Sequence, residues 1–161
     1  MDSAITFTEL LNYSEQETKR WKEWFASHPA ALEVPFPIAN ATNVKGLLTH
    51  IVSVELLFAR AVSNLPRLSW PEMHALADPN PFAVSEDATK MFRAFIDSAH
   101  PEDWAEVKDV GFSGFKASKR KMITQALLHG INHRAQLSTH LRQHGFGDMW
   151  RHDFIATDVI P

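Results

Sequence analysis

The chain has 161 residues, of which 45% are apolar and 22% are charged, as is usual for a soluble globular protein. A formal net charge of −3 without a basic stripe argues against nucleic acid or an anionic membrane as a partner, and no apolar run approaches the ~20 residues that a membrane-spanning helix needs. The lack of cysteine excludes disulfides, thiolate metal ligands and a cysteine nucleophile. The first residues do not resemble a signal peptide, so we expect a cytoplasmic protein. We expect a single domain over residues 1–161.

Four long segments show the periodicity of amphipathic helices. The first covers residues 6–28, and the second follows an N-cap at Asn43 and reaches about residue 64. The third is predicted to begin at an N-cap, Ser85, because two acidic residues follow it, and to end before Pro101. The fourth covers residues 118–144 and stops at Gly145, a typical C-terminal residue.

The connections between these helices are broken by prolines and glycines. Residues 29–42 are expected to be irregular, and residues 66–84 leave room for a short helix over 71–77. Residues 104–117 alternate loosely and contain two glycines, which predicts a short β-hairpin before the last helix. The sequence therefore predicts an all-α protein, a four-helix bundle in which each helix buries one apolar stripe.

Nine histidines are many for a chain of this size, and histidine is the commonest metal ligand in proteins. In the last helix His129 and His133 are four residues apart, so both imidazoles lie on one face and can reach one ion. The spacing is not specific, because His140 and His144 repeat it. The first pair borders the apolar stripe, whereas the second lies in the last turns, where a cationic imidazole is favourable. The first pair is therefore the better candidate for a metal site.

A catalytic zinc-type site has three protein ligands and one open position. His50 is the candidate for the third ligand, because it borders the apolar stripe of the second helix and is expected to point inwards. Alternatively, each histidine is a buried side chain with its own hydrogen-bond partner. The remaining histidines are expected to be solvated or to cap helix ends, namely His28, His74, His100 and His152.

Carboxylates are scarce near these candidates. Residues 118–147 contain no Asp or Glu, the second helix contains only Glu55, and no Glu-x-x-His occurs, which excludes a ferritin-like di-iron centre. Gly130 stands where the helical zinc-protease motif has its general-base glutamate. Any catalysis would therefore use the metal to activate water or a substrate atom directly.

In three stretches the chain resembles the DinB-like superfamily of metal-dependent four-helix-bundle proteins. The first, NVKGLLTHIVSVE, contains His50, and the second, LLHGINHRAQL, contains His129 and His133 followed by Arg134 and Gln136. The third is LRQHG, followed later by DFI. The resemblance implies a bundle with a long crossover, a three-histidine site for zinc or nickel, and a homodimer.

The resemblance also suggests a chemistry. Relatives with assigned activities transfer or rearrange low-molecular-weight thiols, and they include a bacillithiol transferase and a mycothiol-dependent isomerase. The isomerase type has glutamate where this chain has His129, so that subgroup fits less well. The leading hypothesis is a metal-dependent thiol S-transferase, with a hydrolase-like enzyme as its variant.

We expect the three histidines to bind one divalent ion as neutral imidazoles, with a water or a substrate thiol at the open position. Zinc or nickel is favoured, and iron, manganese or copper also suits such ligands. Glu55, Arg134 and Gln136 are candidates for orienting the ligands, since a ligating imidazole normally donates its other N–H to a fixed acceptor. Of these, Glu55 can accept directly, whereas Arg134 can only organise an acceptor. The alternatives are a non-catalytic metal-binding bundle and a metal-free dimeric interaction module.

Overall fold

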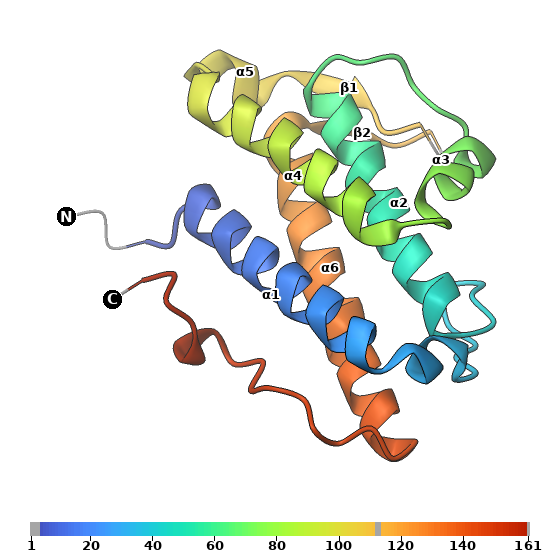
Figure 1. Ribbon diagram of the computed structural model, residues 1–161. Coiled ribbons are helices and arrows are strands. Elements are labelled where there is room, and N and C mark those ends of the chain that lie inside the picture. The colour runs from blue at the N-terminus through green and yellow to red at the C-terminus, as the bar shows by residue number, and fades with distance from the viewer. Residues whose placement is uncertain (1–3, 112–113, 161) are drawn as a thin grey trace.

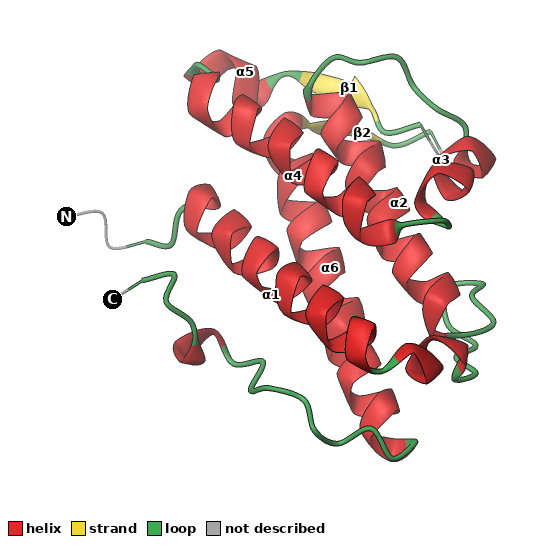
Figure 2. Ribbon diagram, in the orientation of Figure 1, coloured by secondary structure: helices red, strands yellow, loops and turns green. Residues whose placement is uncertain are grey.

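A computed structural model describes residues 4–111 and 114–160 of the chain, and four long helices make up most of it (Figures 1 and 2). They are α1 (Phe7–Ser27), α2 (Val44–Val62), α4 (Pro81–Ser98) and α6 (Lys119–Gln143). Between them lie the shorter helices η1 (Pro29–Glu33), α3 (Trp70–Ala77) and α5 (Pro101–Ala105), and η2 (Phe154–Ala156) follows near the C-terminus. An antiparallel hairpin of β1 (Val107–Asp109) and β2 (Lys116–Ser118) precedes α6. The predicted helical bundle with a hairpin before its last helix is therefore confirmed, although residues 112–113 of the predicted hairpin lie outside the described residues.

The four long helices pack in a ring in which sequence neighbours are not always spatial neighbours. Helix α2 packs against α4 and α6, and α1 packs against the same two helices from the other side. Helices α2 and α4 run in the same direction, so the chain between them, which includes α3, has to return along the bundle, and this connection is the long crossover (Figure 1). The histidine-bearing helices α2 and α6 are thus direct neighbours.

Three of the four helix starts follow the local signals in the sequence. Asn43 accepts a hydrogen bond from the Gly46 N–H at 2.9 Å at the start of α2, and Ser118 caps α6 in the same way. The predicted cap at Ser85 is wrong. The N-cap is Asn80, five residues earlier, and helix α4 begins at Pro81, because proline suits the first helical position and lacks only an N–H that would be unpaired there.

Two large apolar clusters fill the bundle, a smaller third one lies between α2 and α3, and a polar layer separates the two large ones. One cluster surrounds Phe58, Phe92 and Ile123, and the other surrounds Trp21 and Leu137. Along α2, α6 and α1 the residues between the two clusters are polar and buried, and they include Glu55, His133, Arg134 and Ser14. Because buried polar groups are costly unless they are hydrogen-bonded, the side chains of this layer need specific hydrogen-bond partners on the neighbouring helices.

The C-terminal segment runs beside α1 (Figure 1). The Trp150 indole N–H donates to the buried Glu17 carboxylate at 2.9 Å, and the His152 ring bonds the same group at 2.8 Å. His152 also stacks on Trp21, so the prediction that it is solvated is wrong. No helix in the described residues is both long and apolar enough to cross a bilayer.

Candidate metal centre

His50 from α2 and His129 and His133 from α6 meet in the middle of the bundle. Their ligand nitrogens all lie within 4.8 Å of one another, and the Nε2 atoms of His50 and His129 are 3.1 Å apart. Two consecutive turns of α6 supply the second and third imidazoles, as the four-residue spacing requires. No other cluster of three or more potential ligands of this kind occurs in the residues that the structure describes.

The surroundings keep two of these imidazoles neutral. Burial lowers the pKa of His50 to about 4, with the charges of His133 and His74 acting in the same direction. Burial likewise lowers the pKa of His129 to about 3, with smaller contributions from its histidine neighbours and Arg134. A neutral imidazole has a lone pair to give to a metal, so His50 and His129 are in their ligating form at neutral pH.

Gln136 orients the third imidazole. Its Oε1 atom lies 2.8 Å from Nδ1 of His133. An amide oxygen can only accept, so Nδ1 carries the proton and Nε2 of His133 keeps its lone pair. This is the arrangement in which a partner outside the ligand set fixes the tautomer and ring of a metal ligand.

Glu55 has a different role from the one suggested by the sequence. Its carboxylate accepts from the Ser85 hydroxyl at 2.6 Å and from the Arg134 guanidinium at 3.0 Å, and it makes no hydrogen bond to an imidazole in the described structure. Arg134 also donates to the hydroxyls of Ser14 and Thr18 on α1. Burial raises the pKa of Glu55, while Arg134 and Ser85, which favour the carboxylate, offset part of that rise. The network ties α1, α2, α4 and α6 together beside the histidines.

Gly130 allows this network to approach α6 closely. A Cβ atom at this position would lie 3.3 Å from Oε1 of Glu55 and 3.4 Å from Nη1 of Arg134. Such contacts are tighter than ordinary van der Waals distances. This explains a glycine in a helix interior, where it costs roughly 1 kcal/mol relative to alanine.

A cavity of about 360 Å³ adjoins the histidines, and both His50 and His129 line it. Most of its other walls are apolar side chains from α2, α3 and the loop between them, namely Val54, Leu57, Phe58, Leu68, Trp70 and Met73. Residues 67–73 supply several of these walls, and among the described residues the C-terminal segment supplies none. A second hollow, of about 550 Å³, also touches His50 and Trp70 and extends towards His74.

Several partners in the polar layer could not be found from the sequence. Ser14 and Thr18 on α1 and Ser85 on α4 are ordinary hydroxyl residues whose role depends on what the neighbouring helix presents. His140 and His144 join no three-residue ligand cluster in the described part of the chain; His140 instead bonds the Pro35 carbonyl oxygen at 2.7 Å.

Comparisons with known proteins agree with this fold. The chain matches the DinB family over residues 1–152 and belongs to that family. Among solved structures it is similar to YjoA, a DinB-like protein from Bacillus subtilis, with a TM-score of 0.55 and 14% sequence identity over 91% of this chain and 94% of that one. At this identity the likeness shows the fold alone. A comparison with curated proteins gives no match. The family and the histidine cluster are together compatible with metal binding.

Proposed function

We propose that this chain is a metal-dependent enzyme whose single divalent ion is held by His50, His129 and His133. The observation that carries the proposal is the cavity of about 360 Å³, because two of these three histidines line it. A substrate in the cavity would therefore lie next to an open coordination position. When bound, the ion supplies Lewis-acid activation, which makes a water or a thiol a nucleophile at neutral pH.

The chain's own residues prepare the site for that chemistry. The imidazoles of His50 and His129 are neutral, and Gln136 fixes the ring of His133. The Glu55–Arg134 pair holds α2 and α6 in register, and the mostly apolar walls of the cavity exclude water from the reacting groups. Among the described residues the cavity lining contains no carboxylate, so no Asp or Glu is placed to act there as a general base.

Zinc or nickel is the ion we favour, and a low-molecular-weight thiol is the favoured nucleophile. Three nitrogen ligands suit several divalent ions, and availability decides among them. The thiol is supported by the family resemblance of the histidine segments. In the proposed S-transfer the thiolate sulfur forms a bond to a carbon atom of an electrophile, the leaving group departs with its electron pair, and the thiol proton passes to solvent.

Metal analysis of protein purified without a polyhistidine tag tests the site. We expect one equivalent of zinc in the wild type, loss of that zinc in His133→Ala, and retention in His144→Ala, which removes a histidine of the second pair. Full stoichiometry in His133→Ala would show that the proposed site is wrong.

A reaction assay tests the catalytic use. The zinc-loaded protein should accelerate the reaction of bacillithiol or glutathione with monochlorobimane, in which the sulfur–carbon bond forms and chloride leaves. His133→Ala should not. Stoichiometric zinc with no acceleration for any thiol or water nucleophile would favour a non-catalytic metal-binding bundle.

A further inference from the structure

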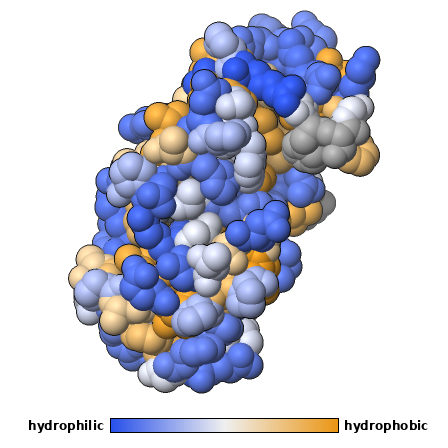
Figure 3. All heavy atoms as spheres, turned by 90° about the vertical axis from the view of Figure 1, so that its right-hand side faces the viewer, coloured by the Kyte–Doolittle hydropathy of each residue, from blue (hydrophilic) through white to orange (hydrophobic). Residues whose placement is uncertain are grey.

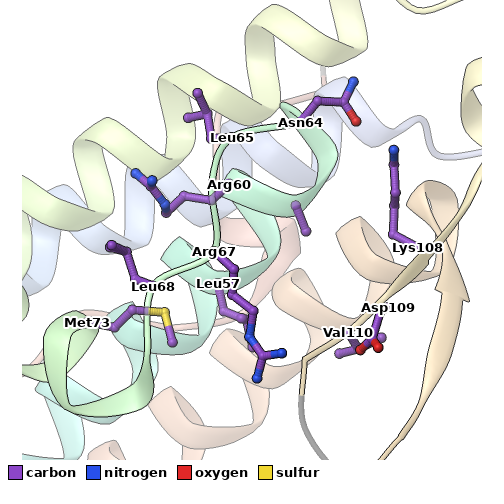
Figure 4. A pocket seen from close by; sticks show the side chains of 11 residues that line it. Leu57, Arg60, Asn64, Leu65, Arg67, Leu68, Met73, Lys108, Asp109 and Val110 are labelled. Atoms are coloured by element: carbon purple, nitrogen blue, oxygen red, sulfur yellow. The ribbon is translucent and has the colours of Figure 1, made fainter.

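Arg67 supplies the only cationic side chain among the described residues that line the cavity beside the histidines. It lies in the loop between α2 and α3, and its side chain extends across towards the segment after β1 (Figure 4). There it packs on Gly111, where an added Cβ atom would lie 2.5 Å from Nε and 2.6 Å from Cζ of Arg67. Gly111, with a φ of +89°, thus leaves room for the guanidinium at the rim of the cavity.

This guanidinium has no partner in the described part of the chain, whereas the cations around it do. Arg60 donates to the Pro66 carbonyl oxygen at 2.7 and 3.0 Å, and Lys108 pairs with Glu106 at 2.5 Å. Arg67 forms neither a hydrogen bond nor an ion pair with any described residue. An arginine fork without a partner among the described residues matches the paired oxygens of a carboxylate, a phosphate or a sulfonate.

The position of Arg67 places such an anion at a defined end of the cavity. Arg67 also lines an adjoining hollow of about 410 Å³, together with Leu57, Leu68 and Met73, so it stands where the two hollows meet (Figure 4). Apolar side chains occupy most of the wall between Arg67 and the histidines. The surface on the side of α3 is mainly hydrophilic, with apolar residues in separate patches (Figure 3). An occupant is therefore expected to be apolar in its middle and charged at the rim.

We propose that the substrate is a small organic anion, with its apolar body in the cavity and its carboxylate or other oxyanion bound to the Arg67 guanidinium. The reacting group at its other end would then face His50 and His129. The orientation towards the histidines rests on the proposed function, whereas the anion site at Arg67 can be measured without the metal.

The test compares two probes that have the same shape and differ in charge. Isothermal titration at pH 7.5 measures the binding of 3-phenylpropanoate and of the neutral 3-phenylpropanamide to metal-free protein. Because a hydrogen bond between two charged groups is stronger than one to a neutral amide, the wild type should prefer the anion by on the order of tenfold or more. Arg67→Gln should abolish the preference. Arg120→Gln, which removes an exposed arginine from the start of α6, should keep it.

Two results would overturn the inference. One is equal affinity of the wild type for both probes, or no binding of either. The other is a preference for the anion that survives in Arg67→Gln. Measuring the zinc content separates a failure of the Arg67 inference from a failure of the proposed function. Arg67→Gln should retain one equivalent of zinc. His133→Ala should lose its zinc and still prefer the anionic probe. Zinc retained in His133→Ala would overturn the metal site and leave the result for Arg67 intact.

Discussion

Replacing Glu55 by glutamine should destabilise the bundle far more than replacing Glu15, although the ion pair of Glu15 is the shorter one. Glu55 lies 3.0 Å from Arg134, and the two side chains are only 8% and 9% exposed. Glu15 lies 2.7 Å from Arg93, but these side chains are 56% and 35% exposed. Burial, and not distance, should decide the outcome, because only the buried partner is left with a charge that water cannot reach.

The structure sets the size of both effects. Glu55→Gln leaves the Arg134 guanidinium inside the protein with only uncharged partners, and removing the opposite charge from a buried pair costs about 3–5 kcal/mol of unfolding free energy. Glu15→Gln removes a solvent-exposed pair, which contributes about 0–1 kcal/mol. For a chain of this length each kcal/mol lowers the melting temperature by about 2–4 °C, so Glu55→Gln should melt about 6–20 °C lower.

Urea and thermal unfolding of the metal-free proteins at pH 7.5, followed by circular dichroism, measure this difference. A double variant, Glu55→Gln with Arg134→Met, separates the charge from the packing. Because removal of both charges from a buried site is often nearly neutral, the double variant should recover much of the stability. The reasoning is refuted if Glu55→Gln and Glu15→Gln lose the same amount, or if the double variant is no more stable than Glu55→Gln.

Four further predictions concern the site and the contacts that support it. The metal-free protein should lose stability as the pH falls below about 6.5. In the unfolded chain His50 and His129 take up protons there, whereas in the folded protein their pKa values of about 4 and about 3 keep them neutral. Urea unfolding at pH 7.5 and 5.5 checks this, and an unchanged stability would contradict it. Gln136→Ala should weaken zinc binding about 10–100-fold in a chelator competition, since it frees the His133 ring. Asn80→Ala should cost about 1 kcal/mol through the lost cap, with zinc affinity unchanged. Ser85→Ala should cost about 1.5–3 kcal/mol, because it removes a hydrogen bond to the buried Glu55 carboxylate; equal costs for the two variants would argue against that contact.

Most helix ends were predictable because the signals that set them are local. Asn43 and Ser118 cap the amides three residues further on, so the sequence alone contains the whole interaction. Ser85 shows the limit of this reasoning. Its hydroxyl and the acidic residues after it have the pattern of a helix start, but its partner is Glu55, thirty residues away. Nothing within one turn of Ser85 reveals that partner.

The histidine cluster was predictable for a similar reason, and its surroundings were not. The spacing of His129 and His133 fixes their common face on any α-helix, and the apolar stripe predicts that His50 points inwards. Which polar side chains meet in the layer beside them depends on how α1, α2, α4 and α6 are rotated and staggered against one another. The sequence therefore suggested Glu55 as a partner of an imidazole, and the packing made it the partner of Arg134.

The sequence by itself determined the bundle, the hairpin before the last helix and the three candidate ligands, because periodicity, caps and spacing act within a few residues of the chain. Only the tertiary structure decided where the cavity lies, that Arg67 at its rim has no partner among the described residues, and that Gly130 lets the Glu55 side chain approach α6 beside Arg134. These features arise between elements that are distant in the sequence, and their geometry is set by close packing of side chains from several helices at once.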